Sequence, residues 1–377
     1  MMEPDPLQQV CRTFVRFHGR KLSYFSGCDY FRLASHPRVM AAAQSGVQRY
    51  GLNVAASRLT TGNHVLYERL ESKLASFFDA PAALTVPSGY LSNLVAAQGL
   101  RGSFSHVLLD EWAHPSLADA AGWVDCPVLR FRHRDAADLA RAVQRCGTGS
   151  RLLLLTDGMF SQDGAVAPLA QYLKVLPKDA LLLVDDAHGA GVLGRTGKGT
   201  PEHCGISRRR LIQTITLSKA FGVYGGAILS SISFRRRMVD GSRLFLGSTP
   251  LPLPLAAAAL QAIDVLQADA AMRQRLTDNV ARVKQALSQA GLDLPPHPGP
   301  IVTLFPAHSS AIPQSKQALV AARIYPPYTR YPGAGAGGCF RFVLSSEHTS
   351  RQLDRLIKAL LHEVRLGRVS PTTRNPR

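Results

Sequence analysis

The sequence predicts an α/β protein with a mostly parallel β-sheet in a large domain, followed by a smaller C-terminal α/β domain. Short apolar, β-branched runs alternate with helical patterns between about residues 82 and 230, and strands that alternate with helices build a parallel sheet. Two further strand-like runs, at 301–305 and 339–344, follow two long helical segments. The chain of 377 residues is long enough for two such cores.

The order of these patterns divides the chain into four parts. In the first part, His18 and Gly19 are expected to turn a short hairpin. The last part is polar and basic, which favours a flexible tail. The expected parts are an N-terminal arm at 1–35, a large domain at 36–265, a small C-terminal domain at 266–366 and a flexible tail at 367–377.

Helices and strands of both domains are predicted from apolar spacing and start signals. His36 and Pro37 open a helix with Val39, Ala43 and Val47 on one face, because proline suits the first helical turn. A second helix places apolar residues at 66, 70, 74 and 77, and a third begins at 88. Strands are expected at 82–86, 107–110, 151–156, 181–185, 211–217 and 226–230, and later helices at 255–270, at 273–290 and around 353–364.

Composition narrows the class of protein. Hydrophobic residues make up 46% of the chain and charged residues 19%, as in ordinary globular proteins. No apolar run of about 18 residues predicts a membrane span, and the first residues lack the apolar core of a signal peptide. The six cysteines have irregular spacing, which favours reduced thiols over disulfides or a metal site. We therefore expect a cytoplasmic protein without a metal.

The net charge of +18 is high for such a chain. Arginine clusters at 130–134, 208–210 and 235–237 favour a polyanionic substrate, such as coenzyme A or an acidic carrier protein. Nucleic-acid binding is the other interpretation, but no helix-turn-helix, RNA-binding aromatic motif or zinc finger accompanies the charge. Solvated surface arginines remain a third explanation.

Lys219 is the first candidate for chemistry. It follows an apolar strand-like run and Ser218, and small residues and glycines come after it. A lysine at the end of a buried strand is well placed to hold a cofactor aldehyde as a Schiff base. An ordinary strand-end lysine is the alternative on this segment alone.

A second strand decides between these alternatives. The run at 181–184 leads into Asp185 and His188. Pyridoxal phosphate requires a carboxylate at its pyridine nitrogen and a hydrogen-bond donor near its phenolic oxygen. Asp185 and His188 at the mouth of a parallel strand meet both requirements. In contrast, 194–200 only looks like a phosphate loop, because its glycine spacing is wrong, and we interpret it as a turn.

The two segments resemble the α-oxoamine synthases, a family of pyridoxal-phosphate enzymes of fold type I. The segments 216–222 (TLSKAFG) and 184–194 (VDDAHGAGVLG) carry the resemblance, which extends from about residue 17 to about residue 361. Within the family the chain is most similar to the 8-amino-7-oxononanoate synthases. Other segments that resemble family motifs are 28–33 (CDYFRL), 157–164 (DGMFSQDG), 246–250 (LGSTP) and 340–344 (FRFVL).

The resemblance implies specific roles for single residues. His114 would stack on the cofactor ring, and Arg341 would bind the carboxylate of the amino-acid substrate. An ion pair with Glu347 is the alternative for Arg341, with Arg32 and Arg58 as the next candidates for the carboxylate site. The implied catalytic residues are Lys219, His114, Asp185 and His188; the cofactor contacts also include Ser88, Gly89, Tyr90, Ser161, Thr216, Ser248 and Thr249; and the substrate contacts are Arg341, Ser161 and Cys28.

The implied reaction is a decarboxylative condensation of L-alanine with a pimeloyl thioester of coenzyme A or a carrier protein, giving an α-aminoketone. The family resemblance also implies a homodimer with shared active sites. Cys28 stands where the family often has asparagine, and Tyr67 where it often has histidine. These departures keep open a related synthase that joins glycine or serine to another acyl-CoA, like 2-amino-3-ketobutyrate ligase or serine palmitoyltransferase. A nucleic-acid-associated protein on the same scaffold is a remote alternative.

Overall fold

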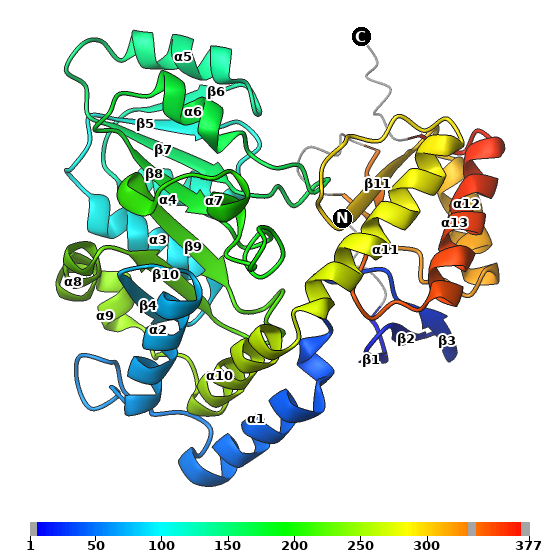
Figure 1. Ribbon diagram of the computed structural model, residues 1–377, viewed down its shortest axis with the longest axis horizontal. Coiled ribbons are helices and arrows are strands. Elements are labelled where there is room, and N and C mark those ends of the chain that lie inside the picture. Colours follow the sequence, from blue (N-terminus) through cyan, green and yellow to red (C-terminus); the bar gives the residue numbers. More distant parts are fainter. Residues whose placement is uncertain (1–5, 331–336, 371–377) are drawn as a thin grey trace. The chain divides into compact units, whose positions relative to one another are not determined.

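The computed structural model describes residues 6–330 and 337–370 and divides into two compact units (Figure 1). The large unit comprises His36–Ser161 and Val166–Ala270. The small unit combines the described residues up to Ser35, Gln162–Ala165 and the described residues from Ala271 onward. The segment predicted as an N-terminal arm thus belongs to the same compact unit as the C-terminal part of the chain.

A seven-stranded sheet forms the centre of the large unit, in the order β4-β10-β9-β8-β7-β5-β6 (Figure 1). The strands from β9 to β6 pair in parallel. β10 runs antiparallel to both of its neighbours, so the sheet is mostly parallel, as predicted. The strands are β4 (Ala82–Val86), β5 (His106–Asp110), β6 (Val128–Phe131), β7 (Leu152–Asp157), β8 (Leu181–Asp185), β9 (Leu211–Thr216) and β10 (Gly226–Ser230).

Most strands of this sheet, including the edge strand β4, are buried along their length rather than at alternate residues. All residues of β4, β7 and β9 are buried, which is what a sheet covered on both faces requires. The helices α3 (Gly89–Leu100) and α4 (Pro115–Trp123) pack on it, and their apolar side chains join those of the strands in one core. Burying one leucine side chain in such a core contributes roughly 1.5–3 kcal/mol.

The other helices of the large unit surround this core. α1 packs on α10 with Gly46 at the contact, where an added Cβ atom would lie 2.7 Å from the Cα atom of Pro254. The predicted apolar face of α1 is only partly correct, because Val39 is buried but Val47 is 44% exposed. These helices are α1 (Pro37–Tyr50), α2 (Val65–Phe77), α5 (Ala136–Arg145), α6 (Leu169–Val175), α7 (Thr200–His203), α8 (Ile232–Gly241), α9 (Arg243–Gly247) and α10 (Leu253–Ala268), with a 3-10 turn at Arg208–Arg210.

The described part of the small unit contains two small sheets and three α-helices. The hairpin expected at His18 and Gly19 is present, as β2 pairs antiparallel with β3, and β1 extends it to three strands. A second sheet has the order β12-β13-β11-β14. The elements are β1 (Gln9–Cys11), β2 (Phe14–Phe17), β3 (Arg20–Ser23), a 3-10 turn (Leu33–Ser35), α11 (Ala271–Gln289), β11 (Ile301–Pro306), α12 (Ala311–Ala321), β12 (Tyr328–Thr329), β13 (Cys339–Val343), α13 (Ser350–Arg365) and β14 (Val369–Ser370).

The end of the chain differs from the sequence-based expectation. Val369–Ser370 pairs with β11, where the sequence predicted the beginning of a flexible tail. The rest of the predicted tail, 371–377, lies outside the described residues. Within the described ranges no single helix has both the length and the apolar content to cross a membrane; only the bent pair α10 and α11 meets those criteria together.

Candidate active site

The carboxyl ends of three parallel strands bring polar residues to one edge of the large unit's sheet. β7 ends at Asp157 and β8 at Asp185, and these two residues are direct partners in the parallel register. β9 ends at Thr216, two residues beyond Thr214, the partner of Asp185. Lys219 follows in the next turn. Because these strands run in the same direction, the residues emerge together where α/β sheets bind ligands.

Asp185 is a buried carboxylate whose orientation is fixed by two donors. It is 6% exposed. Its Oδ2 accepts a 2.6 Å hydrogen bond from the side-chain amide of Asn93, and its Oδ1 accepts one of 3.0 Å from the backbone of Ala187. Asn93 in turn accepts from Thr214 Oγ1 at 2.6 Å. The carboxylate is therefore held in place from α3 and β9.

Sequence reasoning missed Asn93. Asn93 is fully buried in helix α3, and a buried amide requires partners, but this burial becomes visible only in the structure. It donates to Ser116 Oγ at 2.8 Å as well as to Asp185. Asn93 thus links the residue expected at the pyridine nitrogen with the start of α4.

His114 precedes α4 and caps it. Its Nδ1 accepts a 3.2 Å hydrogen bond from the backbone N–H of Ser116 and lies 2.7 Å from the Ser116 hydroxyl. Since Nδ1 is an acceptor, the neutral ring carries its proton on Nε2. Burial lowers the pKa of His114; the Asp185 carboxylate opposes this shift and the Lys219 ammonium adds to it. His114 is thus held neutral with one N–H to donate.

Asp157 lies between these groups and is a second buried carboxyl. Its Oδ2 accepts a 2.8 Å hydrogen bond from the backbone N–H of His114. Burial raises the pKa of Asp157 well above its ordinary value, and the neighbouring charge of Asp185 adds to this shift. Two adjacent carboxyls cannot easily both be ionised, so Asp157 is the one that favours the protonated form.

The start of α3 forms a cradle for an anion. Ser88 is the N-cap, and its Oγ accepts from the backbone N–H of Leu91 at 3.2 Å. Among the described residues, the N–H groups of Gly89 and Tyr90 have no hydrogen-bond partner, as is usual for a first helical turn. A Cβ atom at Gly89 would lie 2.6 Å from Thr216 Cβ, so only glycine fits this contact.

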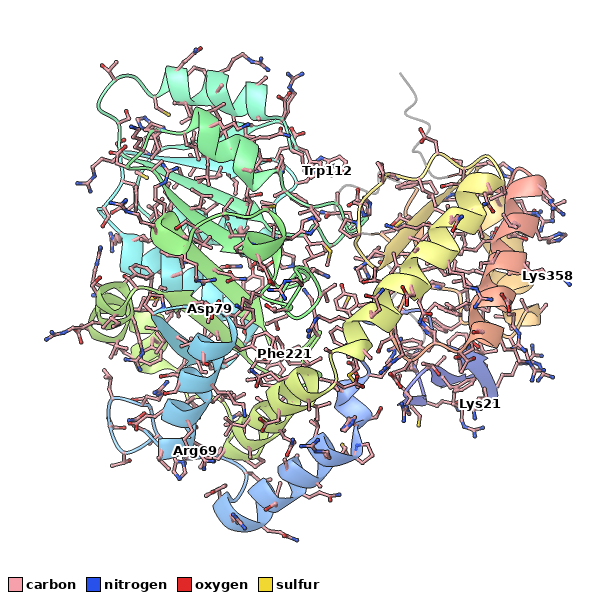
Figure 2. The ribbon with its side chains drawn as sticks, viewed as in Figure 1. Lys21, Arg69, Asp79, Trp112, Phe221 and Lys358 are labelled. Carbon is pink, nitrogen blue, oxygen red and sulfur yellow. The ribbon has the colours of Figure 1, made fainter. Side chains whose placement is uncertain are left out.

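Lys219 is half-buried in a tight turn after β9. The backbone N–H of Gly222 donates to the carbonyl of Lys219 at 3.0 Å, and that of Val223 donates to the Leu217 carbonyl at 2.9 Å. Phe221 (Figure 2) is fully buried, with its ring 6.0 Å from the ring of Phe77. The turn that carries the lysine is thereby fixed to the core of the large unit.

The other predicted cofactor residues of the large unit lie in different settings. His188 and Ser161 are buried, with 3% and 2% of their surface exposed. Ser248 follows α9 and its hydroxyl donates to the Leu244 carbonyl, while Thr249 is exposed. Tyr90 bonds through its hydroxyl to Asp119.

Asp186, next to Asp185, has a structural role. Its carboxylate accepts hydrogen bonds from Thr200 N at 2.9 Å, from Thr200 Oγ1 at 2.6 Å and from the Gln213 side chain at 2.6 Å. Burial raises its pKa to about 7. An added Cβ atom at Gly189 would lie 2.1 Å from its Oδ1. Asp186 thus anchors the turns that follow β8.

The sequence that resembled a phosphate loop is a turn, as predicted. The Glu202 carboxylate accepts from the backbone N–H of Thr196 at 3.1 Å and from that of Lys198 at 3.0 Å. These donors are therefore already used within the protein. Gly194, Gly197 and Gly199 all have positive φ angles, which explains their spacing.

Arg341 and Cys28 come together in the small unit. Arg341 lies on β13, is 8% exposed, and its Nη atoms are 3.7 and 3.8 Å from the Cys28 sulfur. The alternative partner Glu347 is bound instead by Arg12 and Arg275. The structure thus pairs the two residues that the sequence assigned to the substrate.

The two other arginines considered for the carboxylate site are engaged differently. Arg58 forms a buried ion pair with Glu71. Arg32 is 4% exposed, donates from Nη2 to the Tyr24 carbonyl at 3.0 Å and has a φ of 53°. Its Nε has no hydrogen-bond partner among the described residues. Tyr67, which stands where the family often has histidine, is buried and donates to the Leu251 carbonyl at 2.7 Å.

The chain is similar in sequence to proteins of a known family. The model of the family described as aminotransferase class I and II matches residues 28–360. The chain belongs to this family. It is 37% identical over 350 residues to an 8-amino-7-oxononanoate synthase of Thioalkalivibrio sulfidiphilus, covering 92% of this chain and 89% of the relative. A Bacillus subtilis protein named 8-amino-7-oxononanoate synthase 1 is 33% identical, with coverages of 94% and 91%.

Solved structures agree with this assignment. The chain resembles a serine palmitoyltransferase of Sphingomonas wittichii with a TM-score of 0.87 and 26% identity, covering 94% of this chain and 90% of that one. It resembles an 8-amino-7-oxononanoate synthase from Francisella tularensis with a TM-score of 0.79 and 25% identity, covering 92% and 98%. These findings confirm the α-oxoamine synthase family, the fold, the enzyme class and the cofactor, pyridoxal phosphate, that the sequence predicted.

Proposed function

We propose that this chain catalyses the decarboxylative condensation of L-alanine with a pimeloyl thioester, the reaction of an 8-amino-7-oxononanoate synthase. The identity of 37% to a relative of that name supports the substrate assignment. The observation that carries the chemistry is the group of Asp185, His114 and Lys219 at one sheet edge, with Asn93 fixing the carboxylate.

The residues of the large unit fit pyridoxal phosphate. The unused N–H groups of Gly89 and Tyr90 at the helix start suit a phosphate, and the buried Asp185 carboxylate suits a protonated pyridine nitrogen. Lys219 would hold the cofactor covalently, and His114 would stack on its ring. The remaining proposed contacts are Ser88, Ser161, His188 and Thr216 of the same subunit and, from the partner, the equivalents of Ser248 and Thr249.

When bound, the cofactor draws electrons away from the α carbon of the amino acid. The protein's own groups then handle protons and orientation. The Lys219 amine removes the α proton, and Arg341 grips the substrate carboxylate through parallel N–H bonds. His114, neutral with its proton on Nε2, is suited to donate to the carbonyl oxygen of the thioester. The α carbon bonds to the acyl carbon as the thiolate leaves, the carboxylate departs as carbon dioxide, and the protonated Lys219 amine returns a proton to the α carbon.

A second candidate joins glycine or serine to a different acyl-CoA. It is favoured by the likeness to serine palmitoyltransferase structures, whose TM-scores reach 0.90. Cys28 beside Arg341 also departs from the asparagine that the family often has there. Association with nucleic acid, the remote alternative, is not proposed, since the family assignment covers residues 28–360.

We also propose that the enzyme is a homodimer. Large apolar side chains that are exposed in the single chain concentrate between residues 40 and 65, and exposed apolar clusters mark association surfaces. The supporting residues are Met40, Val47, Leu52, Leu59 and Val65. Size measurement over a dilution series tests this, and a fully active monomer that retains cofactor would refute it.

The test of the proposed reaction separates cofactor from substrate. Borohydride treatment of the purified, cofactor-loaded protein should attach the cofactor to the peptide that contains Lys219, as read by mass spectrometry. Amino acids are then screened by the change in visible absorbance, and alanine with pimeloyl-CoA should yield 8-amino-7-oxononanoate. A label on another lysine would refute the site, and preference for glycine or serine would favour the second candidate.

A further inference from the structure

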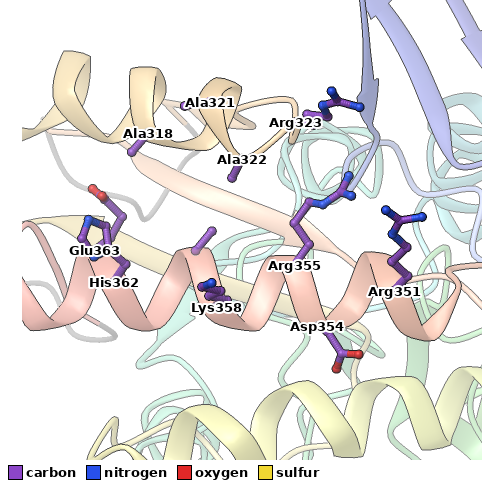
Figure 3. A pocket seen from close by; sticks show the side chains of 11 residues that line it. Ala318, Ala321, Ala322, Arg323, Arg351, Asp354, Arg355, Lys358, His362 and Glu363 are labelled. Atoms are coloured by element: carbon purple, nitrogen blue, oxygen red, sulfur yellow. The ribbon is translucent and has the colours of Figure 1, made fainter.

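A groove between α12 and α13 of the small unit has no role in the chemistry described above. Its volume is about 660 Å³ (Figure 3). Ala318 and Ala321 of α12, with Ala322 directly after the helix, form an apolar wall without long side chains. Arginine and lysine side chains line the opposite side, from α13, and the turn after α12 adds Arg323 (Figure 3).

The cations of this groove are not neutralised within the protein. Among the described residues, the side chains of Arg323, Arg351, Arg355 and Lys358 form no ion pair and no hydrogen bond. All but the half-buried Arg355 are exposed. A groove lined by four uncompensated positive charges should attract an anionic partner.

The two acids that line the groove do have other partners. Asp354 pairs with Arg282 of α11, and in Figure 3 its carboxylate points away from α12. The Glu363 carboxylate accepts from Ser315 Oγ at 2.5 Å and lies 3.3 Å from Arg368 Nη1. Their charges are therefore largely offset by residues other than the four cations.

The basic side chains follow one face of α13. Arg351, Arg355, Lys358 and His362 are separated by four, three and four residues, which places them in a row along the helix. At a rise of 1.5 Å per residue, the row is about 16 Å long. The opposite face carries the buried Leu353, Leu356 and Leu360. A row of this length and spacing matches carboxylates on successive turns of a second helix better than a compact cluster of phosphates.

We propose that this groove docks an acidic helix of the carrier protein that delivers the acyl thioester. The proposal rests on the proposed function, because it names the carrier of the donor substrate. The short alanine side chains let the backbone of a partner helix approach closely, and the row of cations pairs with its acids. Charge complementarity of this kind accelerates association and orients the partner.

The test measures binding directly, without turnover. A fluorescently labelled acidic acyl carrier protein with a pimeloyl-phosphopantetheine arm is titrated with the cofactor-loaded enzyme at low salt. The double variant Arg351→Glu/Lys358→Glu should weaken binding about tenfold or more, since each change replaces attraction by repulsion. The matched control Arg69→Glu/Arg145→Glu changes the same net charge on exposed residues of α2 and α5, and should change binding less than about twofold.

Each outcome separates docking from catalysis. Both variants should retain wild-type turnover with pimeloyl-CoA, because neither touches the proposed site. Equal weakening by both variants, or none by the groove variant, would overturn the proposal.

If adenosine 3′,5′-bisphosphate displaced the carrier and bound more weakly to the groove variant, the groove would be a nucleotide site instead. Arg351→Gln/Lys358→Gln, which removes charge without reversing it, serves if the first variant fails to fold. If the enzyme bound the carrier but formed no condensation product, the proposed reaction would be wrong, while the docking proposal would still hold.

Discussion

Asp185 and Asp186 are adjacent in sequence and both are buried, yet their surroundings differ. Asp186 receives three hydrogen bonds from Thr200 and Gln213 and anchors a turn. Asp185 receives one from Asn93 and one from a backbone amide, and its charge influences His114 and Asp157. Both carboxylates accept only from neutral donors, so the difference lies in their neighbours. Asp185 lies close to His114 and Asp157, whose pKa values it shifts, and a carboxylate among such titratable groups is suited to chemistry.

The largest expected effect comes from the lysine beside Asp185. Lys219→Ala should lower the condensation rate by about 10³-fold or more, because it removes both the covalent anchor and the proposed base. Borohydride should then leave no cofactor on the protein. The free energy of unfolding should stay within about 1 kcal/mol of the wild-type value, since Lys219 is only half-buried. A variant that keeps substantial activity would show that another amine carries the reaction.

Asp185→Asn tests the reactive member of the pair. Turnover should fall by about 10²–10³-fold, because a neutral amide cannot stabilise a protonated ring nitrogen. The absorbance spectrum of the bound cofactor should shift as well, which a purely structural role would not produce. The comparison fails if activity and spectrum stay at wild-type values while the protein loses stability.

Asp186→Asn tests the structural member. At pH 5 the free energy of unfolding should be about 1–3 kcal/mol lower than that of wild type, because the carboxamide leaves a buried donor without an acceptor. The pKa of Asp186 is raised to about 7 in the folded protein, so the native state retains a proton that the unfolded chain releases from about pH 4 upward. Wild-type stability therefore declines between about pH 4 and pH 7. The variant lacks this decline.

Asp186→Asn should consequently lower the free energy of unfolding by less at pH 8 than at pH 5. Urea unfolding at both pH values checks this, with Asp157 contributing equally to both proteins. If the loss of unfolding free energy caused by the substitution grew with pH instead, Asp186 would be ionised in the folded protein and stabilised by its hydrogen-bond donors. Binding of the cofactor at saturating concentration should be retained in the variant.

Two buried arginines extend the comparison. Arg341→Lys should weaken amino-acid binding by about 1.5–3 kcal/mol, because lysine cannot make two parallel N–H bonds to a carboxylate. Arg58→Lys, at the ion pair with Glu71, should affect stability instead. Amino-acid titrations followed by absorbance measure the first effect. Identical titrations of Arg341→Lys and wild type would leave Arg341 with a structural role only.

The smallest expected effect concerns ionic strength. If the basic surface captures an anionic donor, the Michaelis constant for the thioester should rise several-fold between low and high salt, while that for the amino acid changes little. Equal changes in both Michaelis constants would show that the basic surface has no role in capturing the thioester.

The site residues that stand at the ends of strands could be predicted from the sequence. β8 and β9 are almost entirely buried, so the positions of Asp185 at the end of β8 and of Lys219 after β9 follow from the fold of a parallel sheet. Asn93 was not accessible, because its function depends on the distance between α3 and β8 in the folded chain. The different roles of Asp185 and Asp186 likewise depend on partners from other segments, namely Asn93 for Asp185 and Thr200 and Gln213 for Asp186.

Departures from family motifs were a less reliable guide. Tyr67 kept a change of specificity open, and the structure adds only that its hydroxyl donates to the Leu251 carbonyl, a contact that the sequence does not reveal. The exposure of Val47 was missed because apolar periodicity shows that a helix has a face, not what covers it. Helix α12 was not predicted, and the groove that it forms with α13 could be found only in the structure.

The left-handed backbone at Arg32 has a consequence for conformational strain. A φ of 53° at a residue with a side chain costs about 1–2 kcal/mol relative to the right-handed region. Its buried Nε, with no partner among the described residues, adds a desolvation cost. Position 32 thus carries strain in its backbone and a desolvation cost in its side chain, and a glycine there would relieve the backbone strain but remove the hydrogen bond to the Tyr24 carbonyl. The segment that carries Cys28 is accordingly maintained by the surrounding fold, against its own local preference.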